Sequence, residues 1–180
     1  LSLPGLPSRD PSSTALAEAL QRNGYDVVRH PGPEECLAPI APGGWNEHRR
    51  AFKKYDRTVK NFSNKAARLG VVTTEHYGPG GRPPIEGFES YVALHALGWK
   101  GPLREPMLSH RRELLQRAGA RGMAHLFVMR VADVPAAAII WFRIGAVAIA
   151  YSTVYDQRLA ALSAGTIVMW QAHEALLESG

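Results

Sequence analysis

Three polar side chains with catalytic potential stand where the sequence changes from apolar to polar. Tyr151 and Asp156 lie in and just after an apolar run, and Lys100 lies in a glycine-bounded turn. A phenol can protonate a leaving thiolate, and a carboxylate at a strand end can accept a proton or position an amine. A lysine can contact a phosphate or an acidic acceptor. Tyr151, Asp156 and Lys100 are therefore the candidate catalytic residues.

Each candidate also has a structural interpretation, and the sequence leaves both open. Asp156 can satisfy its own backbone in a turn. Tyr151 can belong to the core, because aromatic residues in apolar strands are usually buried. Lys100 can be a solvated turn residue beside Trp99, which we expect to be a packing anchor.

A second group of residues has the pattern of an anion-binding turn. The apolar run ends in a polar loop, and a segment with a single glycine then leads into a helix through Glu178. A glycine at such a junction lets backbone amides approach a ligand, and a helix N-terminus favours a negative charge. The pattern predicts a site for the pyrophosphate of an acyl-coenzyme A, formed by Arg158, Ser163, Ala164, Gly165 and Thr166.

The elements that must position these residues are three apolar runs and a terminal helix. The runs cover residues 124–131, 134–142 and 146–155 and are separated by short breaks. Their length and their β-branched and aromatic content predict antiparallel strands buried on both faces. Upstream, the pattern predicts a strand at 71–75, a loop at 78–84 and helices at 85–97 and 107–118.

The clearest helix covers residues 52–69. Apolar residues recur at spacings of three and four, which places one stripe inward: Phe52, Tyr55, Val59, Phe62, Ala66 and Leu69. The other faces are basic. This basic helix, 48–69, is either a solvated outer face or a surface for an anionic membrane, carrier or substrate. Without aromatic residues interleaved on its basic side, nucleic acid is a poor candidate.

Composition limits the class of protein. With 180 residues, 46% of them hydrophobic, the chain can form about one domain with a real core. The single cysteine excludes an internal disulfide and favours a reducing cytoplasm. The net charge of +5 favours anionic partners. We expect no metal, because no ligand pairs stand at metal spacing. Pro135, Arg143 and Gly145 interrupt the longest apolar region, so a hairpin is favoured over a transmembrane helix.

The order of elements resembles the GNAT superfamily of acyltransferases, over residues 45–180. The resemblance rests on Gly98-Trp99-Lys100-Gly101, on the run from Tyr151 to Asp156, and on the segment from Leu162 to Thr166 before a helix. The chain is most similar to the FemAB-like acetyltransferase domains of polysaccharide and cell-envelope biosynthesis. The resemblance implies an α/β (α+β) fold with a mixed, mostly antiparallel sheet flanked by helices. Strands expected after the last helix are missing.

The resemblance also implies acyl transfer to an amine or hydroxyl, with acyl-coenzyme A as the usual donor. Our main hypothesis is an acyl-coenzyme A-dependent N-acyltransferase acting on a small-molecule or glycan-precursor acceptor. Two alternatives remain. The turn carries one glycine where the superfamily usually has more, which permits a non-catalytic binding domain. The basic helix is the local support for an aminoacyl-tRNA-dependent ligase. The domain would cover residues 45–180, after a helix–strand segment and linker in residues 1–44.

Overall fold

The computed structural model describes residues 11–24, 27, 44–145 and 147–178. Its contacts divide the chain into two units, Leu1–Pro39 and Ile40–Gly180. In the first unit, α1 (Pro11–Arg22) is followed by Gly24 in the left-handed conformation, as expected for a helix end. The strand predicted at 25–28 and most of the linker at 31–44 fall outside the described residues. The domain boundary after residue 44 stays a prediction.

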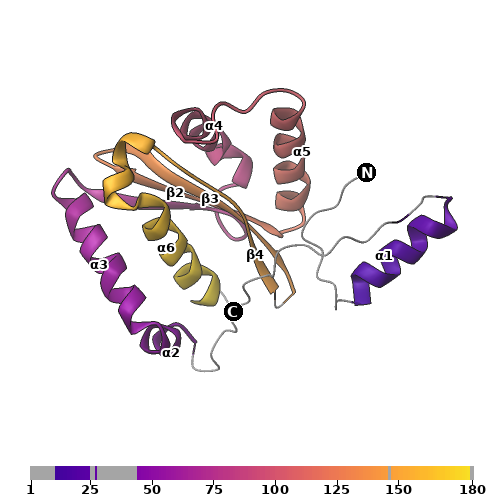
Figure 1. Ribbon diagram of the computed structural model, residues 1–180, viewed down its shortest axis with the longest axis horizontal. Helices are drawn as coiled ribbons and strands as arrows, with labels where there is room; N and C mark the ends of the chain where they lie inside the picture. Colours follow the sequence, from indigo (N-terminus) through magenta and orange to yellow (C-terminus); the bar gives the residue numbers. More distant parts are fainter. Residues whose placement is uncertain (1–10, 25–26, 28–43, 146, 179–180) are drawn as a thin grey trace. The chain divides into compact units, whose positions relative to one another are not determined.

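A four-stranded antiparallel sheet forms the centre of the second unit (Figure 1). Its strands follow the chain in the order β1 (Val72–Tyr77), β2 (Ala124–Val131), β3 (Val134–Ile144) and β4 (Val147–Tyr155). Ala132 and Asp133 both have positive φ, which is the backbone of the tight two-residue turn between β2 and β3. The three strands expected from the apolar runs are confirmed.

Burial differs between the central strands and β4. Nearly all of β2 and the middle of β3 are buried, as expected. The expectation of burial on both faces is wrong for the first half of β4, where Val147, Ile149 and Tyr151 are exposed. The physical reason is that the helices bury the faces of the sheet, and α4 and α6 pack mainly on β3, while β4 lies at the edge of the described sheet.

One face of the sheet is covered by three helices: α2 (Gly44–Ala51), α3 (Lys53–Ala67) and α6 (Ala164–Glu178) (Figure 1). Helix α6 crosses β2, β3 and β4, and α2 and α3 pack against α6. Their apolar core includes Phe127, Ile139 and Ile167. This layer brings the first turn of α6 to the end of β4.

The other face is covered by the short 3-10 helix η1 (Pro84–Gly87), α4 (Phe88–Leu97) and α5 (Met107–Ala120). Phe88, Tyr91 and Leu94 of α4 are fully buried against the sheet. The sheet therefore separates two apolar cores. None of the described helices has both the length and the apolar content that crossing a membrane requires.

The predicted helix 52–69 is divided at its start. Phe52 interrupts the chain between α2 and α3 with φ −104° and ψ 36°. Val59 and Ala66 are buried as expected, but Phe52 and Leu69 are 43% and 57% exposed. The break turns α2 so that Trp45 and His48 pack on α6 in place of Phe52. The predicted stripe is therefore confirmed at Val59 and Ala66 and wrong at Phe52, Leu69 and Tyr55, which is 39% exposed.

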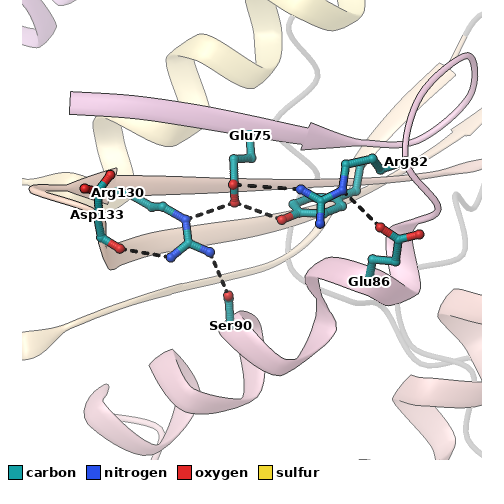
Figure 2. Close-up of polar contacts among 7 residues, drawn as sticks. Glu75, Arg82, Glu86, Ser90, Arg130 and Asp133 are labelled. Atoms are coloured by element: carbon teal, nitrogen blue, oxygen red, sulfur yellow. Dashed lines mark hydrogen bonds and ion pairs between the residues drawn. The ribbon is translucent and has the colours of Figure 1, made fainter. Parts of the chain in front are cut away.

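An ion-pair network connects β1 and β2 to α4 (Figure 2). The Glu75 carboxylate accepts hydrogen bonds from Arg130 Nε at 2.9 Å and from the Tyr77 hydroxyl at 2.8 Å. Arg130 also donates to Ser90 Oγ on α4. Burial raises the pKa of Glu75, but the hydrogen bonds from Tyr77 and Arg130 outweigh it and hold this pKa below its ordinary value. The network fixes the first turn of α4 under the sheet.

We expect Glu75→Gln to destabilise the protein by about 1 kcal/mol at pH 7, because the half-buried Arg130 loses its charged partner. The lowered pKa sets the pH dependence. Stabilisation by Glu75 is complete above the pKa of the unfolded state, near 4.5, and is lost as pH falls through the folded pKa. Urea denaturation at pH 7 and pH 3.5 measures both effects. The control Glu86→Gln, in an exposed pair with Arg82, should change stability by less than about 0.5 kcal/mol. If Glu75→Gln reduced the free energy of unfolding equally at both pH values, the ionic origin of the stabilisation by Glu75 would be contradicted.

Candidate functional site

An open pocket of about 490 Å³ lies beside β4 at the first turn of α6. Strand β4 contributes one wall, the turn before α6 a second, and the turn between α4 and α5 a third. The lining residues are Tyr55, Trp99, Lys100, Ala150, Tyr151, Ser152, Thr153, Tyr155, Ala160, Ser163, Ala164, Gly165, Thr166 and Met169. The pocket thus lies where the sequence predicted an anion-binding turn.

The turn before α6 is sharp. After β4 the chain forms the 3-10 helix η2 (Gln157–Leu162), and Ser163 then takes a left-handed conformation with φ 49°. The Ser163 carbonyl accepts hydrogen bonds from the amides of Thr166 and Ile167, which starts α6. The first N–H groups of a helix have no partner within that helix. Ala164 and Gly165 line the pocket at this end of α6, which is the positive end of the helix dipole.

Gly165 is closely packed. A Cβ atom there would lie 3.3 Å from Tyr155 Cδ1 and 3.5 Å from Thr153 Cγ2. Its φ is not positive, so the backbone does not require glycine. The glycine instead allows α6 to pack closely on β4, which brings the amides of its first turn next to the strand.

Strand β4 carries a β-bulge in the pocket wall. Ile140 on β3 pairs with Ser152, and the next residue, Trp141, pairs with Ala150. Tyr151 is therefore an extra residue without a partner on β3. A bulge interrupts the backbone ladder and redirects a side chain. Tyr151 is 39% exposed and lines the pocket, so it is not a core residue.

Lys100 supplies a positive charge to the pocket. Its Nζ donates to the Thr153 carbonyl at 3.2 Å and lies 5.6 Å from the centre of the Trp99 ring. Burial, followed by the charge of Arg111, lowers the pKa of Lys100. Trp99 itself is 68% exposed, so the expectation of a packing anchor is wrong. The glycine-bounded turn holds its indole at the pocket and away from the core.

Asp156 and Arg158 face each other and are not among the lining residues. Asp156 is 2% exposed, and its carboxylate accepts from the Arg158 amide at 2.9 Å and from the Arg158 guanidinium at 2.7 Å. These side-chain hydrogen bonds outweigh burial and hold the pKa of Asp156 below its ordinary value. Both residues therefore stabilise the turn between β4 and η2.

Six of the predicted site residues line one pocket: Lys100, Tyr151, Ser163, Ala164, Gly165 and Thr166. Sequence reasoning missed Ser152, which is half-way along an apolar run, and assigned Tyr55 and Trp99 to packing. The adjacency of Ser152 to Tyr151 was the one available signal. No carboxylate or histidine lines the pocket in the described part of the chain, and the described residues place no three metal-ligating side chains together.

We expect Lys100→Met to weaken binding of coenzyme A about tenfold, because the variant removes the one charged side chain that the described residues contribute to the pocket wall. The loss should shrink at high salt, since screening already weakens the wild-type contact. Calorimetric titration at 50 mM and 500 mM NaCl measures it. Arg121→Met, at an exposed position outside the pocket, is the control and should bind as wild type does. Unchanged affinity in Lys100→Met would remove Lys100 from the binding site.

The second unit is thus an α+β domain, in which helices cover both faces of an antiparallel sheet and a pocket lies between the edge strand and a helix N-terminus. Residues 53–180, more than half of the chain, match the family model described as an acetyltransferase (GNAT) domain. The protein belongs to this family, and the predicted GNAT-like fold class is confirmed. A comparison with curated proteins found no match.

Proposed function

We propose that this protein is an acyl-coenzyme A-dependent N-acyltransferase that acts on an amine or hydroxyl acceptor. The observation that carries the proposal is the convergence of the α6 amides, Lys100 and the bulged strand β4 on one pocket. Family membership supports transferase chemistry. The resemblance to FemAB-like domains supports a glycan-precursor acceptor and a role in cell-envelope or polysaccharide biosynthesis, with the reaction in the cytoplasm.

The pocket offers groups for each part of the donor. The first turn of α6, at Ala164 and Gly165, suits the pyrophosphate, because a helix N-terminus combines N–H groups that have no partner within the helix with the positive end of the helix dipole. Lys100 adds a charge on the opposite wall. Tyr151 is the bulge residue and lines the pocket, which supports the proposal that its hydroxyl protonates the departing thiolate. The donor supplies an activated acyl group, so the chain needs only to orient it and stabilise the developing charge.

We propose positioning roles for Asp156 and Arg158. A carboxylate with a lowered pKa and an arginine partner is a weak base. Asp156 caps η2 through the Arg158 amide and thereby sets the direction of the turn that leads to Ser163. In the open pocket, the proton of the attacking amine can pass to water.

Calorimetry with acetyl-coenzyme A tests the proposal. We expect saturable 1:1 binding at micromolar to millimolar ligand and competition by coenzyme A. Desulfo-coenzyme A lacks the thiol but keeps the pyrophosphate and the 3′-phosphate. It should therefore bind similarly, and it serves as the control for the pyrophosphate contact. Absence of heat and of a thermal shift at millimolar ligand would overturn the proposal. Binding without transfer to any amine or hydroxyl acceptor would favour the alternative of a non-catalytic binding domain.

The basic face of α3 is the proposed contact for an anionic carrier or membrane surface. Lys53, Lys54, Arg57 and Arg68 are exposed on it, while Tyr55 of the same helix lines the pocket. A carrier bound along α3 would hold its acceptor group near the donor. Co-sedimentation with anionic phospholipid vesicles tests this contact. Steeply salt-dependent binding of tRNA would instead favour the aminoacyl-tRNA-dependent alternative.

A further inference from the structure

Three residues from separate elements form a chain of polar contacts that ends at the pocket. Arg111 on α5 donates through Nη1 to the hydroxyl oxygen of Tyr91 on α4. That hydroxyl lies 2.8 Å from Ser152 Oγ on β4. Tyr91 is fully buried, and Ser152 is 7% exposed and lines the pocket. Burial raises the pKa of the Tyr91 phenol, which therefore keeps its proton.

The direction of these hydrogen bonds follows from the chemistry of the donors. A guanidinium can only donate, so the Tyr91 oxygen accepts from Arg111. Among the described residues, Ser152 Oγ is the remaining hydrogen-bond partner of this hydroxyl. If Ser152 donated to Tyr91, the buried phenol proton would have no acceptor, at a cost of about 1–3 kcal/mol. Tyr91 therefore donates to Ser152.

This direction leaves the Ser152 proton without an acceptor inside the core. A hydroxyl that accepts a hydrogen bond becomes a better donor, and the positive charge of Arg111 polarises the chain in the same sense. Ser152 lies directly after Tyr151, the bulge residue, on the strand that forms the pocket wall. Its free donor is thus available to a carbonyl oxygen in the pocket.

We propose that Ser152 donates a hydrogen bond to the carbonyl oxygen of the acyl group, and that Tyr91 and Arg111 are positioning residues that orient its hydroxyl. The proposal rests on the proposed function, because it assumes a thioester in this pocket. During transfer the attacking nitrogen bonds to the carbonyl carbon and the π electron pair moves to oxygen. The carbonyl then re-forms, the C–S bond breaks, and the thiolate leaves with the bonding pair and takes the proton of the Tyr151 hydroxyl. The amine proton passes to water, and water returns a proton to Tyr151. The Ser152 hydrogen bond strengthens while charge resides on oxygen.

A pair of non-transferable ligands tests the contact without requiring the acceptor. Acetonyl-coenzyme A is a thioether ketone that keeps a carbonyl, and propyl-coenzyme A has the same three-carbon chain without it. By calorimetry, the wild type should bind the ketone about threefold to tenfold more tightly, the contribution of one hydrogen bond. Ser152→Ala should bind both ligands equally, while Ser152→Thr, which keeps the hydroxyl, should retain the preference. Ser109→Ala, at an exposed position on α5, is the control.

The positioning role predicts a non-additive pair of variants. Tyr91→Phe should lose most of the preference for the ketone, because Ser152 can then turn its proton away from the pocket. The double variant Ser152→Ala/Tyr91→Phe should lose no more than Ser152→Ala alone. If Tyr91 had only a structural role, Tyr91→Phe would weaken the binding of both ligands equally, and the ratio of the two dissociation constants would not change.

Each outcome separates this inference from the function on which it rests. If the wild type binds neither ligand, the proposed donor site is overturned, and the role of Ser152 is overturned with it. If the wild type binds both ligands equally, or Ser152→Ala keeps the preference, the role of Ser152 is overturned while the donor site stands. If Tyr91→Phe leaves the ratio of the two dissociation constants unchanged, only the positioning role of Tyr91 is overturned.

Discussion

Gly165→Leu should weaken acetyl-coenzyme A binding about a hundredfold or more. At this position even a Cβ atom approaches Tyr155 Cδ1 to 3.3 Å, so a larger side chain must enter the pocket or force α6 away from β4. Either movement displaces the amides of the first turn from the anion. Calorimetric titration measures the loss, and in an enzyme the rate of acyl transfer should collapse with it.

A second glycine provides a matched control. Gly119 lies in α5, and its added Cβ would approach Pro84 Cδ to 3.2 Å, a contact as tight as that at Gly165. Gly119→Ala and Gly165→Ala should therefore reduce stability by similar amounts, whereas only Gly165→Ala should reduce donor affinity. If Gly165→Leu folds and binds the donor normally, the turn before α6 is not the pyrophosphate site. Partner binding that survives Gly165→Leu would favour a non-catalytic binding domain.

Acid should destabilise the protein between pH 6.5 and pH 4 through buried histidines. Burial, then the neighbouring His76, lowers the pKa of His125 to about 4. Burial, then His48, lowers the pKa of His173 to about 4 as well. The unfolded chain binds these protons first. The neutral histidines therefore contribute their full stability above pH 6.5, and this contribution falls as pH drops toward 4.

His125 alone should account for about 2 kcal/mol of this loss at pH 5, from 1.36 kcal/mol for each unit between pH 6.5 and pH 5. Urea denaturation of wild type and His125→Leu at pH 7 and pH 5 measures it. The variant should lose about 2 kcal/mol less than the wild type on acidification. His110→Leu, at an exposed position on α5, is the control for replacing a histidine by leucine. An unchanged dependence in His125→Leu would show that this ring is not the titrating group.

Much of the fold could be predicted from local pattern. The strands β2 and β3 are continuous apolar runs because both faces of the sheet are covered, and the periodicity of α3 reflects one buried stripe. The break at Phe52 could not be predicted. It depends on Trp45 and His48 competing for the surface of α6, more than 100 residues away in the chain.

The candidate site could be predicted only where it depends on a local sequence pattern. A strand followed by a glycine turn and a helix is a local pattern, so the turn before α6 was visible. The bulge at Tyr151 could not be predicted, because nothing in the apolar run 146–155 indicates where the pairing of β4 with β3 shifts by one residue. Nor could the contact of Ser152 with Tyr91, which joins residues 61 positions apart. Asp156 was a candidate from the sequence, but its ion pair with Arg158, which supports a structural role, was not predicted.

The bulge has a consequence for how β4 could have arisen. On β4, Ala150 pairs with Trp141 and Ser152 with Ile140, so the alternation of faces is unbroken if Tyr151 is skipped. A chain one residue shorter at this point could align with β3 along its whole length, and no other side chain would change sides. Tyr151 is thus a single extra residue that the pairing of β3 with β4 does not require, and it stands where it lines the pocket.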